Sequence, residues 1–216
     1  MSGESKFLIG IGVFTAIIIA AGIFFFSRSK PQENVNEKAD EAVLLSNTKN
    51  SQGDPNASVK IVEFVDLQCP ACRTAQHIVK SMIEKHKDQV YFVWRYYPLS
   101  THKNARPAAR AAEAAASQGK FWEMIDILFT KQPEWSEKSD PKDLYIGYAQ
   151  ELGLDVEKFK ADLDASYDII DRDFADGNKV GVSSTPTFFI NGEKKPGVLQ
   201  EAEFEAYFQP QPSTSE

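Results

Sequence analysis

Runs of apolar residues divide the chain into an apolar N-terminal segment, a polar stretch and a longer region of mixed strand and helix patterns. The 20 residues from Phe7 to Phe26 contain no charged side chain. As a helix, they are long enough to cross the roughly 30 Å of a bilayer's hydrocarbon core. We therefore expect a transmembrane anchor over residues 7–26, after a short flank over 1–6. A cleaved signal peptide is the alternative, although signal peptides usually have shorter apolar cores and a small-residue cleavage site.

The following segment, residues 27–57, is polar and carries charges of both signs. This composition predicts a flexible linker that precedes a globular domain over residues 58–216. The short apolar run Val43-Leu44-Leu45 interrupts the linker, and it could instead form an edge strand of that domain.

The globular region begins with a strand, helix, strand pattern. Residues 59–65 (VKIVEFV) are almost continuously apolar and β-branched, which is typical of a strand buried on both faces. After Cys69, apolar residues recur at steps of three and four, as in an amphipathic helix. Residues 90–97 (VYFVWRYY) predict a second strand that ends at Pro98.

Helical patterns then dominate as far as about residue 180. A small-residue face over 105–116 and an apolar stripe over 121–129 are followed by helical patterns over about 141–152, 155–164 and 166–179. The chain returns to strand pattern at 187–190, and Asn191-Gly192 predicts a hairpin turn. A last helix is expected over 200–208. The order predicts an α/β fold in which a small mixed sheet carries an α-helical insertion over about 102–180.

Composition and charge exclude several classes of protein. The hydrophobic content of 42% is enough for a folded core, so a disordered chain is excluded. The net charge of −7 provides no long-range basic field, so we expect no nucleic-acid partner. Cys69 and Cys72 are the only two cysteines, so a framework of several disulfides is also excluded.

The motif Cys69-Pro70-Ala71-Cys72 lies between a buried strand and the start of a helix. Free amides and the positive end of the helix dipole stabilise a thiolate at Cys69. The spacing of three residues brings the two cysteines within disulfide range, so the pair can cycle between dithiol and disulfide. A purely stabilising disulfide is an alternative. Half of a zinc site is another, but no second CxxC exists and the histidines lack ligand spacing, so we expect no metal.

Pro186 precedes the strand TFFI, a position that suits a cis peptide bond in a tight turn. Together, several segments resemble the DsbA-like thiol:disulfide oxidoreductases of thioredoxin fold, in particular their membrane-tethered Gram-positive branch. The resemblance runs from about Gly53 to Phe208 and rests on these segments: GDPNASVKIVEF, the Cys-Pro-x-Cys motif, YYPLSTHKNARPAARAAEAAASQGKFWEMIDILF and STPTFFING.

The resemblance implies a role for each site residue. Cys69 would be the exposed nucleophile and Cys72 its buried partner. Pro186 would be the cis-proline beside the two sulfurs, and Thr185 would offer its backbone to an extended substrate. The substrate would also contact the residues between the cysteines, Pro70 and Ala71.

Glu63 falls where related enzymes keep a buried acid that relays protons to the inner cysteine, and its apolar neighbours favour burial. One departure concerns Ala71, because the best-studied periplasmic members have histidine there. Alanine cannot donate a hydrogen bond or a charge to the thiolate, so we expect a less acidic Cys69 and a milder oxidant. Of the other polar residues, His102 is expected to cap a helix or lie on the surface. Arg95 is expected to be solvated at its strand end, with a position near the rim of the active site as the alternative.

The resulting hypothesis is a dithiol oxidase that introduces disulfide bonds into exported proteins. Its partners would be unfolded or folding proteins with free thiols, and an integral-membrane thiol oxidase would reoxidise it. It would need no cofactor beyond the Cys69–Cys72 disulfide. Because disulfides persist in oxidising compartments, we expect a single-pass protein of the cytoplasmic membrane with its catalytic domain on the extracytoplasmic side.

Three alternatives remain at this point. A reductase or isomerase would keep the fold and the cysteine pair but reverse or redirect the electron flow. An extracytoplasmic Cu(I) metallochaperone would use the same two thiolates as soft metal ligands. A non-catalytic anchored binding module would not depend on Cys69 at all.

Overall fold

The computed structural model describes residues 38–165 and 167–209, which belong to one folded unit that begins at Lys38. The expected anchor over 7–26, its flank over 1–6 and the first part of the expected linker lie outside the described residues. Among the residues that the structure describes, no helix combines the length and the hydropathy that a membrane span requires.

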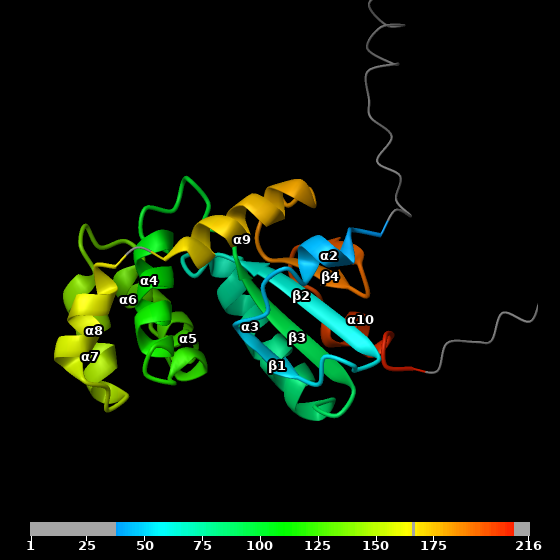
Figure 1. Ribbon diagram of the computed structural model, residues 1–216, viewed down its shortest axis with the longest axis horizontal. Helices are drawn as coiled ribbons and strands as arrows, with labels where there is room; N and C mark the ends of the chain where they lie inside the picture. The colour runs from blue at the N-terminus through cyan, green and yellow to red at the C-terminus, as the bar shows by residue number, and fades with distance from the viewer. Residues whose placement is uncertain (1–37, 166, 210–216) are drawn as a thin grey trace, which may run out of the picture. The chain divides into compact units, whose positions relative to one another are not determined.

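A sheet of five strands in the order β1-β3-β2-β4-β5 forms the centre of this unit (Figure 1). Strands β2 and β3 are parallel, as two strands joined by a helical crossover must be, and the other neighbours are antiparallel. The expected mixed sheet and C-terminal hairpin are confirmed. The strands are β1 (Ser51–Gly53), β2 (Val59–Val65), β3 (Val90–Tyr96), β4 (Thr187–Ile190) and β5 (Glu193–Pro196).

Most helices lie between β3 and β4 in the sequence and form the expected helical insertion. In Figure 1, α4 to α8 gather beside the sheet, whereas α9 runs back along it. The described helices are α2 (Glu41–Leu44), α3 (Pro70–Lys85), α4 (Ala105–Ala116), α5 (Phe121–Thr130), α6 (Gln132–Trp135), α7 (Lys142–Glu151), α8 (Val156–Leu163), α9 (Asp168–Lys179) and α10 (Glu201–Glu205).

The sheet separates two hydrophobic cores because alternate side chains of each strand point to opposite faces. On one face, Ile61 of β2 and Phe92 of β3 pack with α3, α10 and the helical insertion. On the other face, Val62 and Phe64 pack with α2 and α9. The central strands are therefore covered on both faces, as their apolar sequences predict.

The segment before β2 differs from the expected linker, because residues 38–57 belong to the folded unit. The alternative of an edge strand at Val43 to Leu45 is wrong, since α2 covers this run and buries Leu44 against the second core. Asp40 caps this short helix by accepting a hydrogen bond from the Ala42 amide at 2.9 Å.

The edge strand of the sheet is instead β1, which pairs antiparallel with β3. Its last residue, Gly53, has a φ of +91°, and a Cβ atom there would lie 2.0 Å from the carbonyl oxygen of Val90. Only glycine permits this close approach between the end of β1 and the start of β3.

Candidate active site

Cys69 occupies the N-cap position of α3, directly after the loop that follows β2. Pro70 begins the helix, where its missing N–H leaves no hydrogen bond unmade. Cys69 is 7% exposed and Cys72 is 1% exposed. Cys69 is thus the more accessible cysteine, as expected, but it is largely covered rather than openly exposed.

The surroundings favour the charged form of Cys69. A hydrogen bond from the Cys72 side chain is the largest influence that lowers the pKa of the Cys69 thiol, and it prevails over the opposing effect of burial. Thr185 and the backbone amides of Cys72 and Ala71 lower it further, so the pKa of Cys69 falls to about 5. Cys69 is therefore a thiolate at neutral pH when the pair is reduced.

The second cysteine has the opposite character. Burial raises the pKa of Cys72 well above its ordinary value, and the hydrogen bond to Cys69, the charge of Cys69 and the charge of Glu63 raise it further. The two sulfurs therefore differ in charge and exposure. Cys69 is a slightly exposed thiolate, whereas Cys72 is a protonated thiol in the core. A nucleophile and a resolving thiol need this division.

The loop before β4 contacts Cys69. The Thr185–Pro186 peptide bond is cis, as the sequence predicts. The Sγ atom of Cys69 lies 3.3 Å from the carbonyl oxygen of Thr185. Pro70 is exposed and Ala71 half-buried on the rim of the site. The structure thus gathers the two cysteines, Thr185, Pro70 and Ala71 at one end of the sheet.

Glu63 lies inside β2, 2% exposed, and its Oε2 atom has no hydrogen-bond partner among the described residues. The predicted burial is confirmed. Burial raises the pKa of this carboxyl to about 8, so it is largely protonated at neutral pH. Burial also raises the pKa of Cys72, and the charge of Glu63, once that carboxyl is ionised, raises the pKa of Cys72 further. Whether it relays protons stays a prediction.

Several residues that the sequence did not single out hold the active-site loop in place. Gln132 of α6 donates its Nε2 amide to the carbonyl oxygens of Leu67 (2.7 Å) and Cys69 (3.1 Å). The Gln68 side chain accepts a hydrogen bond from the backbone amide of Asn104 at 2.6 Å and donates one to the Ser136 carbonyl oxygen at 2.7 Å. These contacts are long-range, so only the folded chain reveals them. They connect the helical insertion to the loop that carries Cys69.

Two expectations about polar side chains need correction. His102 does contribute to the start of α4 through its carbonyl oxygen, which accepts from the Ala105 amide at 3.1 Å. Its imidazole, however, is not simply a surface group, because Nδ1 lies 2.8 Å from a carboxylate oxygen of Asp66. Arg95 is not solvated at all. It is fully buried and pairs with Asp173 and Asp176 of α9.

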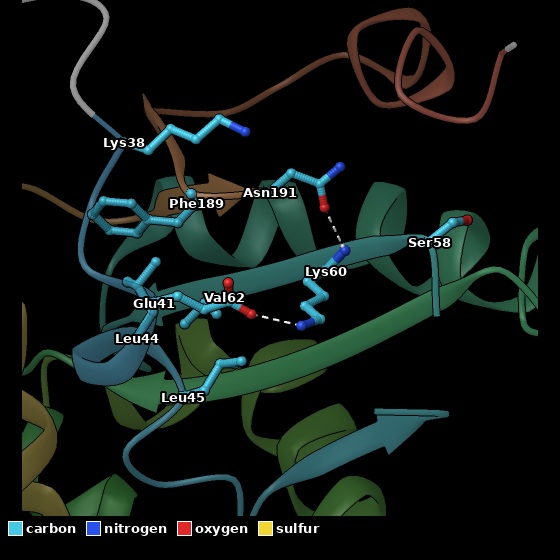
Figure 2. Close-up of a pocket in the computed structure, with 10 residues that line it drawn as sticks. Lys38, Glu41, Leu44, Leu45, Ser58, Lys60, Val62, Phe189 and Asn191 are labelled. Carbon is cyan, nitrogen blue, oxygen red and sulfur yellow. Dashed lines mark hydrogen bonds and ion pairs between the residues drawn. The ribbon is translucent and has the colours of Figure 1, made fainter. Parts of the chain in front are cut away.

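Figure 2 shows a separate hollow on the other face of the sheet, between α2 and strands β2 and β4. Lys60 crosses it, with its amide bonded to the Asn191 side chain (2.8 Å) and its ammonium paired with Glu41 (2.5 Å). Neither cysteine lines this hollow. Across residues 38–165 and 167–209, no group of three or more His, Cys, Asp and Glu side chains is placed to hold a metal ion.

Curated relatives match part of this chain. The Na(+)/H(+) antiporter NhaA 1 of Mycobacterium sp. (strain KMS) is 39% identical over 153 residues, which is 68% of this chain but 24% of the antiporter. The NhaA antiporter of Herminiimonas arsenicoxydans is also 39% identical, over 148 residues and 23% of its length. The chain therefore spans about a quarter of the length of these relatives.

Solved structures resemble the chain over most of its length. A thioredoxin-like oxidoreductase from Silicibacter pomeroyi DSS-3 is 27% identical, with a TM-score of 0.66 over 79% of this chain and 96% of that one. BdbD from Bacillus subtilis is 24% identical, with a TM-score of 0.65 over 78% and 92%. The thiol-disulfide exchange protein alpha-DsbA2 from Wolbachia pipientis is 20% identical, with a TM-score of 0.65 over 76% and 88%.

The last two structures establish likeness of fold alone, whereas the family is established by the sequence. The family model described as Thioredoxin matches residues 45–209, which is most of the chain. These boundaries include the cysteine motif, the helical insertion and the hairpin. The chain therefore belongs to this thioredoxin family and has the DsbA-like fold of thiol:disulfide oxidoreductases.

Proposed function

We propose that this protein is a thiol:disulfide oxidoreductase that works as a dithiol oxidase on exported proteins. The observation that carries the proposal is the contrast between the two sulfurs, because the pKa of Cys69 falls to about 5 while that of Cys72 is raised. A stabilised thiolate is a good leaving group, so a disulfide that contains it tends to pass its oxidation on to other thiols.

The exchange would proceed in two steps. A substrate thiolate attacks Cys69 Sγ of the Cys69–Cys72 disulfide, so that a mixed disulfide forms and Cys72 departs with the electron pair. A second substrate thiolate then attacks the substrate sulfur of the mixed disulfide and displaces Cys69 as a thiolate. Two substrate thiols thereby become one disulfide, and the enzyme's disulfide becomes the dithiol.

Glu63 would assist the first step. Cys72 is a poor leaving group in its buried position unless a proton reaches it, because burial disfavours the anion. Glu63 is a buried carboxyl that still holds its proton at neutral pH. It would donate this proton to the departing Cys72 sulfur and regain one from solvent.

Refolding of reduced, unfolded ribonuclease tests the proposal. The oxidised protein should restore ribonuclease activity with one disulfide consumed per disulfide formed. Cys69→Ser should reduce the rate to the background level, because the remaining thiol cannot form the reactive disulfide. Wild-type protein alkylated at its thiols serves as the control for surface effects. Full activity of the serine variant would contradict the proposal and favour a binding module.

A redox titration tests the direction of electron flow. We expect a potential well above about −270 mV, the thioredoxin value, but below that of family members with histidine in place of Ala71. A potential near the thioredoxin value would favour a reductase. Stoichiometric Cu(I) after anaerobic purification, without any ribonuclease refolding, would favour a copper carrier instead.

The proposed location follows from the same chemistry and from the apolar segment 7–26. The protein would be held in the cytoplasmic membrane with its redox domain outside, where an integral-membrane thiol oxidase would reoxidise it. Fractionation of cells that express the full chain should place it with the membranes. Protease added from outside should degrade the redox domain in cells from which the envelope layers outside the cytoplasmic membrane have been removed. Recovery from the soluble fraction, or protection from the protease, would contradict this part of the proposal.

A further inference from the structure

The loop between β2 and α3 is organised around one carboxylate, that of Asp66. The side chain of Asp66 has no exposed surface. Its Oδ1 atom accepts from the Gln68 amide at 2.7 Å, and its backbone carbonyl accepts from the Cys69 amide at 3.0 Å. The orientation of Asp66 therefore fixes the two residues that lead into the helix, of which Cys69 carries the reactive sulfur.

The other carboxylate oxygen of Asp66 is held from a different part of the chain. Its Oδ2 atom accepts from the Leu99 amide at 2.8 Å and meets the His102 imidazole Nδ1, also at 2.8 Å. Because a carboxylate can only accept, Nδ1 carries the proton of this hydrogen bond. The His102 side chain is 23% exposed, so it joins a fully buried carboxylate to the surface of the site.

Three groups contact the Asp66 carboxylate in the hydrogen bonds given above, and of these the His102 imidazole belongs to a side chain. Two backbone amides, from Gln68 and Leu99, stay in place whatever side chains are substituted. Burial raises the pKa of Asp66, whereas the Leu99 amide and His102 lower it. Loss of the imidazole would thus favour a protonated carboxyl, which holds amide donors more weakly than a carboxylate does.

We propose that His102 is a positioning residue for the redox reaction, which acts through Asp66 to hold the Cys69 sulfur at the start of α3 and beside Thr185. The proposal rests on the proposed thiol:disulfide exchange at Cys69. The His102 side chain bonds Asp66 rather than either sulfur, and its effect passes through the Asp66 carboxylate and the Gln68 and Cys69 amides.

The test compares two substitutions at this position in the full-length, reduced protein. His102→Ala removes the donor. His102→Asn places an amide nitrogen close to the position of Nδ1 and so retains it. The matched control is His86→Ala, because His86 also bonds a carboxylate, that of Glu205 at 3.0 Å, but does so at the far end of α3.

The readouts are the Cys69 thiolate titration, followed by ultraviolet absorbance, and the rate of alkylation by iodoacetamide between pH 4 and 8. We expect His102→Ala to raise the Cys69 pKa by about one unit, which lowers the alkylation rate at pH 4 roughly tenfold. His102→Asn and His86→Ala should both titrate like the wild type. Thermal unfolding measured beside each titration separates loss of positioning from loss of the fold.

The outcomes separate this inference from the proposed function. A wild-type Cys69 that titrates at an ordinary thiol pKa would overturn the proposed function itself. A low wild-type pKa that His102→Ala leaves unchanged would overturn only the role of His102, as would an asparagine variant that behaves like alanine. If the alanine variant does not fold, His102→Leu replaces it, because leucine fills part of the space of the imidazole without a hydrogen-bond donor.

Discussion

The two faces of the central sheet each bury ionisable side chains, but they treat them in opposite ways. Arg95 of β3 points to the face covered by α9, where its guanidinium bonds Asp173 at 2.6 Å, Asp176 at 2.7 Å and the Leu44 carbonyl at 2.7 Å. Glu63 of the neighbouring strand points to the face covered by α3, and within the part of the chain that the structure describes its Oε2 atom has no hydrogen-bond partner. The charge of Arg95 is therefore paired with opposite charges, whereas the Glu63 carboxyl has no such partner among these residues.

The difference matches the proposal that Arg95 has a structural role and Glu63 a reactive one. Arg95 connects α9, β3 and the segment of α2, so its charge holds three elements together without any accessible chemistry. Glu63 has a raised pKa and acts on Cys72, which is the arrangement of a group that exchanges protons. The bonded donors of Arg95 are therefore consistent with a structural role, whereas the buried Glu63 carboxyl is consistent with the proton transfer proposed above.

The largest expected change in stability concerns Arg95, on the face where the buried charges are paired. Arg95→Leu leaves Asp173 buried without its cation and should lower the free energy of unfolding by about 3–5 kcal/mol. Urea unfolding at pH 7 measures this loss. Arg106→Leu is the matched control, because Arg106 also pairs with an aspartate, Asp171, but both side chains are about half exposed or more. The control should cost at most about 1 kcal/mol.

The thiolate titration of the same Arg95 variant sharpens the contrast between the faces. At temperatures where the variant is folded, the Cys69 pKa should equal that of the wild type, because the guanidinium lies across the sheet from the cysteines. An Arg95→Leu protein of unchanged stability, or one with a shifted Cys69 pKa, would show that the two faces are not separate in this way.

The next effect concerns the uncompensated acid and depends on pH. The folded protein keeps the Glu63 proton until about pH 8, whereas an exposed glutamate carboxyl loses it near its ordinary pKa of 4.5. Between these values the unfolded state binds fewer protons, so the free energy of unfolding should fall as pH rises. At pH 7 the cost is on the order of 3 kcal/mol.

Glu63→Gln removes this dependence because glutamine does not titrate. Denaturant unfolding of the disulfide form at pH 5 and pH 8 should show a smaller loss of stability with rising pH in the variant than in the wild type. If stability changed equally between pH 5 and pH 8 in the two proteins, Glu63 would have an ordinary carboxyl pKa in the folded state. The variant should also slow ribonuclease refolding, since no carboxyl is present to protonate Cys72.

The smallest effect concerns a solvent-exposed ion pair. Lys60 and Glu41 form the pair that crosses the hollow in Figure 2, with side chains 35% and 63% exposed. Lys60→Met keeps most of the apolar stem and should change the free energy of unfolding by less than about 0.5 kcal/mol. Chemical unfolding in low and in high salt checks this. A loss as large as that of Arg95→Leu would mean that exposure does not decide what an ion pair contributes.

The sequence predicts most of the fold because its main signals are local. Continuous apolar runs identify β2 and β3, three- and four-residue spacing identifies the helices, and Asn191-Gly192 identifies the hairpin, with Asn191 at a φ of +50°. The pattern does not predict β1, whose residues are polar and become a strand only through pairing with β3. For α2, the local signal is Asp40 before a short run of helix-forming residues, and the polar surroundings of that run obscure it.

For the candidate site, the sequence predicts the residues that would take part in the reaction but not those that support them. Adjacent residues carry the cysteine motif, and the resemblance supplied Pro186, Thr185 and Glu63. The supporting contacts of Gln132, His102 and Asn104 join positions more than 30 residues apart, so no local pattern specifies them. The expectation for Arg95 is wrong for the same reason, since its partners Asp173 and Asp176 come from a distant helix.

The sequence separation of 116 positions from Cys69 to Thr185 has a consequence for a newly made chain. At typical rates of synthesis, on the order of ten seconds pass between the appearance of the cysteine motif and that of its neighbour across the site. In that interval Thr185 cannot contribute to the low pKa of Cys69, whereas Cys72, which lowers that pKa most, is already present in the motif. The contact between Cys69 Sγ and Thr185 therefore forms only after the segment that leads into β4 has been made, long after both cysteines are present.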